Sequence, residues 1–253
     1  MINEKKDLHL CVIMSDSYFP IYQEIFNKTL PREFDSVNIL HVRDCDSTPG
    51  AVGEENFKNI NYKKLQFIAK QLIMHEGDNL LALDLDVVCF KNFKDEINLL
   101  LKDNDMVFQH NKHYENMPYC VATWALQCSR KNINFFDREV LPRSKALLLK
   151  KDVWDEIVRT KTPVPGKWLH HLNGEQQYLD GDACVVNAAI LESDLGKKLN
   201  ISLLSDAYTQ GDGTLPDNPE ECILYQAAST GTGVTAKTTA LTNVYEHIKG
   251  KQQ

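Results

Sequence analysis

The chain has 253 residues, of which 43% are hydrophobic and 25% are charged, and its formal net charge is −7. This composition is ordinary for a folded globular protein and argues against disorder. Because the chain is acidic, it lacks the basic field that attracts a phosphate backbone, and we expect no nucleic acid among its partners. An α/β protein of this length is routinely one domain, so we predict a single domain over residues 1–253.

The seven cysteines are scattered singly, without the paired spacing of a zinc site. This usage favours a reducing compartment. The first seven residues are polar and charged, and no later run approaches the roughly 18 apolar residues of a membrane-spanning helix. We therefore expect a cytoplasmic protein without a transmembrane segment.

In the first half of the chain, apolar runs alternate with amphipathic stretches. The apolar runs predict strands at 8–14, 37–42, 79–83 and 105–109, and the apolar pattern of the third strand resumes at 87–90 after two acids. Helical spacing predicts helices at 19–30, 61–75 and 94–102. The segment 44–53 is rich in Asp, Pro and Gly, which is typical of a loop.

The second half of the chain gives a weaker pattern. Residues 110–144 mix aromatic and polar side chains with little periodicity, and we assign no element there. Beyond them we expect a helix at 152–159, a loop at 163–168, a helical stretch at 175–191, a strand at 201–204 and a loop at 211–233. Strands that alternate with helices predict an α/β/α sandwich around a mainly parallel sheet, whose ligands gather at the carboxyl ends of the strands.

Polar residues follow two of the predicted strands. Ser15 and Asp16 come after the first strand, and Asp84 and Asp86 interrupt an apolar run. Residues i and i+2 of an extended chain point the same way, so the two aspartates can present their carboxylates to one Mg²⁺ or Mn²⁺. Ionised carboxylates at a buried strand end are costly unless they are paired or bind a metal. The alternative is an acidic strand end that faces water.

The segment Leu80-Leu-Ala-Leu-Asp-Leu-Asp-Val-Val-Cys-Phe90 resembles the apolar strand and DxD motif of glycosyltransferases with the Rossmann-like GT-A fold. Tyr62-Lys-Lys-Leu65 is similar to the Tyr-x-Arg-Leu pattern that precedes this strand in glycogenin-like and related bacterial sugar transferases. Lys64 stands in the place of the donor-binding Arg and keeps its charge but not its planar fork. The resemblance implies metal-dependent transfer from a nucleotide-diphosphate sugar, of UDP or GDP type, to a glycan or protein acceptor.

A second match concerns the acid beside the transferred sugar. Asp180-Gly-Asp182, followed by Asn187-Ala-Ala-Ile190, resembles the DQD…LNA helix of the same families. The segment 175–179 is the alternative match, because related enzymes carry an acidic residue followed by an amide there. The resemblance makes Asp182 the first candidate for a catalytic acid and Glu175 the second. Asp182 would be the general base if transfer inverts the anomeric carbon, whereas retention needs no such base.

A third match lies at the end of the sequence. His247-Ile-Lys-Gly250 resembles a carboxy-terminal HxxGxxK element whose His is a third metal ligand and whose Lys binds the diphosphate. Gln253 occupies the place of that Lys, so Lys249 or Lys251 would have to substitute for it.

The resemblance implies a role for each candidate. Asp86 and His247 would ligate Mn²⁺ or Mg²⁺, and Asp84 would contact the metal or the donor ribose. The remaining donor contacts would come from Ser15, Asp16, Lys64 and Lys251. Trp124, Trp154 and Trp168 could stack on a sugar ring, although core packing is the commoner role of a tryptophan.

Two other classes of protein stay open. The run into Asp84-Leu-Asp-Val-Val88 also resembles the first motif of haloacid-dehalogenase-like phosphohydrolases, where the first Asp attacks phosphate. That motif usually follows the first strand, whereas two predicted strands precede it here. A non-catalytic nucleotide-sugar-binding protein is the other alternative, because Lys64 and Gln253 stand where stronger residues are expected.

Overall fold

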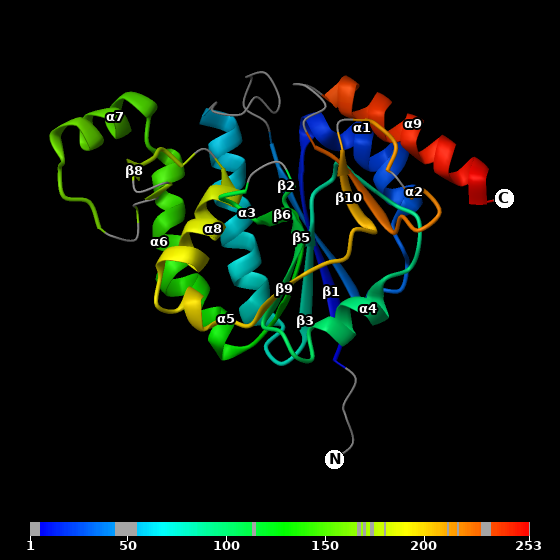
Figure 1. Ribbon diagram of the computed structural model, residues 1–253, viewed down its shortest axis with the longest axis horizontal. Helices are drawn as coiled ribbons and strands as arrows, with labels where there is room; N and C mark the ends of the chain where they lie inside the picture. The colour runs from blue at the N-terminus through cyan, green and yellow to red at the C-terminus, as the bar shows by residue number, and fades with distance from the viewer. Residues whose placement is uncertain are drawn as a thin grey trace, which may run out of the picture.

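The computed structural model describes residues 6–43, 55–112, 115–165, 168, 171–172, 175–179, 181–211, 213–216, 218–228 and 234–252. A six-stranded sheet in the order β2-β1-β3-β6-β5-β9 forms its centre (Figure 1). The strands are β1 (Leu8–Ser15), β2 (Ser36–Val42), β3 (Asn79–Leu83), β5 (Met106–His110), β6 (Tyr119–Gln127) and β9 (Ile201–Leu203). All run in one direction except β6, which is antiparallel to both of its neighbours. The prediction of a mainly parallel sheet is confirmed.

The central strands are buried on both faces, and alternation along them divides the core in two. In β3, Leu80 and Ala82 belong to the core on one face, and Leu81 and Leu83 belong to the core on the other. Each of these four side chains is at most 2% exposed. Continuous apolar runs of this kind are typical of parallel strands covered on both sides.

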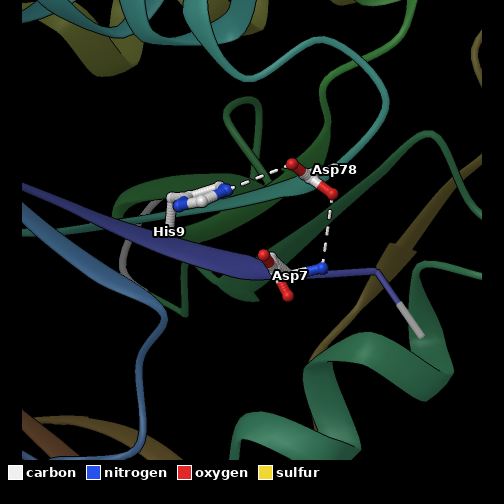
Figure 2. A group of neighbouring side chains, drawn as sticks. All are labelled: Asp7, His9 and Asp78. Atoms are coloured by element: carbon white, nitrogen blue, oxygen red, sulfur yellow. Dashed lines mark hydrogen bonds and ion pairs between the residues drawn. The ribbon is translucent and has the colours of Figure 1, made fainter.

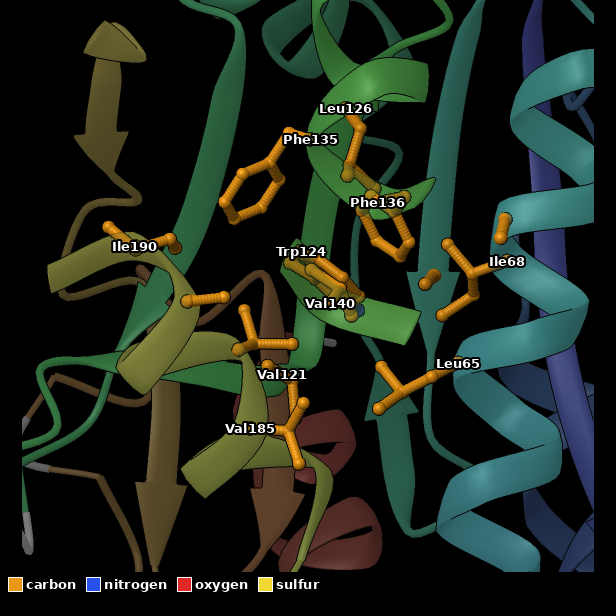
Figure 3. Close-up of a cluster of buried hydrophobic side chains, with 14 of the residues drawn as sticks. Leu65, Ile68, Val121, Trp124, Leu126, Phe135, Phe136, Val140, Val185 and Ile190 are labelled. Carbon is orange, nitrogen blue, oxygen red and sulfur yellow. The ribbon is translucent and has the colours of Figure 1, made fainter. Parts of the chain in front are cut away.

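Helices cover the first face of the sheet, on the left in Figure 1. They are α3 (Glu55–Met74), α5 (Arg130–Phe135), α6 (Leu141–Ser144), α7 (Lys151–Thr160) and α8 (Asp182–Glu192). Figure 3 shows Leu65 of α3 and Val185 of α8 in the cluster that surrounds Trp124 of β6. The Trp124 ring stacks on Phe108 and on Phe136, at centroid distances of 5.2 and 5.8 Å. This aromatic stack fixes the helical layer on the sheet.

The second face is covered by helices together with a smaller sheet. The helices are α1 (Phe19–Ile21), α2 (Asn27–Thr29), α4 (Lys94–Leu100) and α9 (Val234–Gln252), and a π-helical turn (Tyr22–Phe26) joins α1 to α2. The smaller sheet has the order β10-β11-β4, with β10 at Tyr208–Gly211, β11 at Leu224–Ala227 and β4 at Val87–Cys89. Helix α9 packs on it through Leu241, Val244 and Ile248.

Shorter elements complete the described chain. A two-stranded sheet pairs β7 (His171–Leu172) with β8 (Glu175–Gln176). Single turns of 3₁₀ helix lie at Asp16–Tyr18, Lys145–Leu148 and Gly196–Lys198, and a second π-helical turn lies at Phe136–Val140. None of the helices described here is long and apolar enough to cross a membrane.

Two predicted elements are wrong. Residues 175–191 do not form one helix, because Glu175–Gln176 is a strand and α8 begins only after Gly181, whose backbone is extended. The stretch 211–233 is not all loop, because Leu224–Ala227 is a fully buried strand. We missed this strand because it has only four residues and the segments on both sides of it are rich in Gly, Pro and Thr, which are typical of loops. The predicted loop at 44–53 lies outside the described residues.

Candidate functional site

The carboxyl ends of β1 and β3 meet at one edge of the central sheet. The two strands are parallel neighbours, with Val12 of β1 paired with Leu83 of β3. A cavity of about 130 Å³ opens at this edge. Its wall combines the polar side chains of Ser15, Ser17, Lys64, Asp84, Asp86 and Lys237 with the rings of Tyr18 and Phe57. The structure therefore brings together four predicted site residues, Ser15, Lys64, Asp84 and Asp86.

Asp84 and Asp86 are held in place by their own backbone. The Asp84 N–H donates to the carbonyl of Ala122 in β6 at 2.8 Å, and the Asp86 carbonyl accepts from the N–H of Ala227 at 2.9 Å. The Asp84 side chain is 31% exposed, whereas the Asp86 side chain is only 7% exposed. One carboxylate oxygen of Asp86, Oδ1, is buried and has no hydrogen-bond partner among the residues that the structure describes.

Lys64 of α3 joins two acids. Its Nζ lies 2.5 Å from Asp84 Oδ1 and 2.8 Å from Asp182 Oδ2, and it donates to the Val121 carbonyl at 3.1 Å. The lysine side chain is 6% exposed. Asp182 is the first residue of α8, so this one ammonium group ties α3 and α8 to the end of β3.

Burial and neighbouring charges shift the pKa values of Lys64 and Asp84. Burial lowers the pKa of Lys64, but the charges of Asp182 and Asp84 outweigh this effect and raise it above its ordinary value. Burial raises the pKa of Asp84 to about 6, although part of its side chain is exposed; Lys64 opposes the rise, and Asp86 and Asp182 add to it. A cation placed among these carboxylates therefore reduces the repulsion between them and favours their ionised form.

Lys237 of α9 is a functional candidate that our sequence reasoning missed. Its ammonium pairs with Asp86 Oδ2 and lies 5.7 Å from the centroid of the Tyr18 ring. Burial lowers the pKa of Lys237, and Asp86 more than compensates, so the net shift is upward. A signal was present in the sequence. Leu241 and Val244 mark the buried face of α9, and Lys237, four residues before Leu241, lies on the same face and needs an acidic partner.

The two predicted nucleoside contacts differ in position. Ser15 Oγ lies at the cavity, 3.0 Å from Ser17 Oγ. Asp16 does not line the cavity; its carboxylate is half-exposed and lies 2.6 Å from Nε2 of His41. The structure thus brings Ser15, but not Asp16, to the pair Asp84 and Asp86.

The carboxy-terminal candidates are not gathered at the site. His247 is exposed on α9, ten residues after Lys237, which corresponds to about 15 Å along a helix. Its ring does not join Asp84 and Asp86 in a cluster of metal-ligand atoms. Lys251 lies in the last turn of α9 and Glu175 in β8, but their side chains fall outside the described part of the chain, as does all of Asp180.

The three tryptophans lie away from the cavity. Trp124 and Trp154 are at most 1% exposed and belong to the core on the first face of the sheet. Trp168 packs against the same core and is partly buried. None of the three lines the cavity at Asp84 and Asp86.

A second group of side chains of types that can ligate a metal, Asp7, His9 and Asp78, lies at the opposite edge of the sheet, where β1 and β3 begin (Figure 2). His9 Nε2 is 3.3 Å from Asp78 Oδ2, and the Asp7 N–H donates to Asp78 Oδ1 at 3.4 Å. The His9 ring also contacts Ser36 Oγ through Nδ1 at 2.8 Å and stacks on His75 at 3.7 Å. These contacts account for the polar atoms of His9, and we assign the group the structural role of joining the starts of two strands.

Comparison with known proteins bears on the fold. No family model and no curated protein matches this chain. The apo structure of the bifunctional glycosyltransferase WbbM aligns with 99% of this chain and 52% of its own, at 9% identity and a TM-score of 0.54. The glycosyltransferase GlyE of Streptococcus pneumoniae aligns with 97% of this chain and 63% of its own, at 13% identity and a TM-score of 0.49.

The galactosyltransferase LgtC, in complex with donor and acceptor sugar analogues, aligns with 96% of this chain and 99% of its own, at 10% identity and a TM-score of 0.46. The chain thus spans less than two thirds of GlyE and about half of WbbM. At these identities the likeness concerns the fold, and it confirms the GT-A type of α/β fold expected from the sequence.

Proposed function

We propose that the chain is a glycosyltransferase that moves a sugar from a nucleotide-diphosphate donor, of UDP or GDP type, to a glycan or protein acceptor with the help of Mn²⁺ or Mg²⁺. One observation carries the proposal. At the carboxyl edge of a GT-A sheet, a cavity presents Asp84 and the buried, unpartnered Oδ1 of Asp86 together with two lysines.

The donor set fits a hard divalent cation. Carboxylate oxygens are the ligands that Mg²⁺ and Mn²⁺ prefer, and such sites often use one or two carboxylates plus substrate phosphates and water. Asp86 would hold the cation through Oδ1, and Asp84 would contribute its partly exposed carboxylate. When bound, the cation stabilises the negative charge that develops on the departing diphosphate. Because His247 is not gathered here, donor phosphates and water would complete the coordination.

The charges on the protein also suit a diphosphate. Three carboxylates alone would repel an anionic donor, but the ammonium groups of Lys64 and Lys237 oppose them. Lys64 keeps Asp84 oriented, and Lys237 is a positive group on the cavity wall itself. The hydroxyls of Ser15 and Ser17 and the ring of Tyr18 supply hydrogen bonds and a flat surface for the nucleoside. The cavity is smaller than the roughly 300–1,000 Å³ of a complete ligand site, so the donor would extend beyond it.

Asp182 is our candidate for the acid beside the transferred sugar, with Glu175 as the second. The Asp182 side chain is 11% exposed and is engaged by Lys64, and its Oδ1 accepts from the Ala183 N–H at 3.0 Å. Turnover of Asp182→Asn at saturating donor tests the assignment. An unchanged rate would remove Asp182 from the catalytic acids and leave Glu175.

The redox state of the cysteines supports a cytoplasmic location, which we include in the proposal. Cys11, Cys89, Cys120, Cys128 and Cys222 are buried free thiols in the part of the chain that the structure describes. Free buried thiols are typical of a reducing compartment.

The proposed activity is tested by the release of nucleoside diphosphate from UDP- and GDP-sugars, with Mn²⁺ and with EDTA, in the presence of a panel of acceptors. We expect release from one donor class, its loss in EDTA, and a large drop in Asp86→Asn. If the protein instead hydrolyses a phosphomonoester, and Asp84→Asn abolishes that reaction, the chain is a phosphohydrolase. Donor binding without transfer or donor hydrolysis would favour the non-catalytic alternative.

A further inference from the structure

The Asp86 carboxylate is already paired with a positively charged side chain of the protein, Lys237. The Lys237 ammonium pairs with Asp86 Oδ2, while Oδ1 of the same carboxylate has no partner among the described residues. Both groups line the cavity where we propose that a divalent cation binds. With the ammonium on Oδ2 and a metal ion on Oδ1, two cations would lie on one carboxylate, and the repulsion between them weakens the binding of each.

The position of Lys237 allows its ammonium group to move away from Asp86. Its side chain is 20% exposed, and it sits in the first turn of α9, ahead of the buried anchor residues Leu241, Val244 and Ile248. Lys64 is different, because it is 6% exposed and is held by two carboxylates and a carbonyl. Of the two lysines at the cavity, Lys237 is therefore the one whose contact with an acid can be exchanged without moving a helix.

We propose that Lys237 is a resident counter-ion, which holds Asp86 in the free protein and is displaced from it when a divalent cation binds. This inference rests on the proposed function and deepens it. The released ammonium stays beside the Tyr18 ring at the cavity wall, where phosphate oxygens of a donor can accept from it. The cation alone must displace Lys237 without compensation, whereas the cation with a nucleoside diphosphate gives the lysine a new partner. Lys237 thus couples the two binding events.

The inference predicts that one substitution strengthens the binding of Mn²⁺ and weakens the binding of the nucleotide. In Lys237→Met, which keeps the length and apolar stem of the side chain, Asp86 has no competing ammonium. We expect Mn²⁺ alone to bind this variant about tenfold more tightly than it binds the native protein, which corresponds to about 1.4 kcal/mol. We expect UDP or GDP to bind it more weakly in the presence of Mn²⁺. The ratio of nucleotide affinity with Mn²⁺ to nucleotide affinity without Mn²⁺ should therefore be smaller in the variant than in the native protein.

Mn²⁺ binding is measured by electron paramagnetic resonance and calorimetry, without any assay of activity. Lys70→Met is the control, because Lys70 is an exposed lysine of α3 that does not line the cavity. It should change neither affinity. Equal or weaker Mn²⁺ binding by Lys237→Met would overturn the exchange, even if nucleotide and Mn²⁺ still bind the native protein and so uphold the proposed function. Absence of both Mn²⁺ and nucleotide binding in the native protein would overturn both.

A measurement on the native protein covers the case in which Lys237→Met does not fold. Reductive methylation with mass-spectrometric mapping reports how accessible each lysine is. We expect Mn²⁺ to increase the labelling of Lys237 several-fold while Lys64 and the exposed Lys70 stay constant. Unchanged or reduced labelling of Lys237 at saturating Mn²⁺ would overturn the inference.

Discussion

At the scale of single residues, the site is organised by lysines placed between acids. Asp84 and Asp86 could be predicted from the sequence, because two acids that interrupt an apolar strand are conspicuous. Their partners could be predicted only in part. Lys64 was found through its place before the strand, but its second partner, Asp182, is 118 residues away and depends on how α3 and α8 pack. Lys237 was missed because we predicted no helix for residues 234–252, and its pairing with Asp86 depends on where α9 packs.

The Lys64 bridge makes a direct prediction about stability. In Lys64→Met, Asp84 and Asp182 lose a common buried cation, and breaking such a pair from one side typically costs about 3–5 kcal/mol. We expect the free energy of unfolding in urea to fall by an amount in this range. Lys70→Met, at an exposed position of the same helix, should leave it within about 0.5 kcal/mol. A loss below about 1 kcal/mol in Lys64→Met would contradict the bridging role.

At the scale of elements, prediction succeeded where one local pattern dominates. The strands β1 and β3 are continuous apolar runs, and α3 has a clear apolar stripe, although it begins six residues earlier than predicted. β6 was left unassigned because it lies in a stretch of mixed aromatic and polar residues, yet its backbone bonds to β3 and β5 make it a central strand. Its structure comes from pairing with distant residues, which periodicity alone does not reveal.

The turn after α8 gives a prediction at this scale. A side chain at Gly196 would place its Cβ 2.4 Å from the carbonyl oxygens of Ala189 and Ile190, which are backbone atoms of a buried helix and cannot move aside cheaply. We expect Gly196→Ala to lower the free energy of unfolding by about 1–3 kcal/mol. Gly250→Ala is the matched control, because nothing lies within 4 Å of its Cβ in α9. That change should be neutral or stabilising by up to about 1 kcal/mol. Equal effects of the two substitutions would contradict the packing described for the turn.

At the scale of the whole molecule, the layered architecture and the mainly parallel sheet were predictable, because alternating strands and helices leave few ways to bury every apolar face. The covering of the second face was not predictable, since part of it is a small sheet in which β4 joins β10 and β11, and both of these lie far from β4 in the sequence. The acceptor side was not predicted either, and the three tryptophans considered for stacking on a sugar ring lie away from the cavity. The assignment of residues 1–253 to one domain stays a prediction.

Buried thiols in both layers report on the integrity of this architecture. Burial raises the pKa of Cys89, Cys120, Cys128 and Cys222 to about 12, so almost no thiolate is present at pH 8. We expect iodoacetamide to leave these four unlabelled in the native protein and to modify them together as guanidinium unfolds it. Cys184, which is half-buried, should react first among the described cysteines. Rapid native labelling of Cys120, read by peptide mass spectrometry, would contradict the packing of β6.

The most direct test of the central claim is a binding panel of UDP, GDP and their common sugar conjugates, each with and without Mn²⁺, by thermal shift and calorimetry. It is run on the native protein and on Asp86→Asn, which removes the charge but keeps the shape of the side chain. We predict that one class of nucleotide raises the unfolding temperature only with Mn²⁺, because a ligand that binds the folded state selectively stabilises it. The effect should be lost in Asp86→Asn. Absence of any nucleotide response in the native protein, or an undiminished response in the variant, would contradict the assignment of this cavity as the donor site.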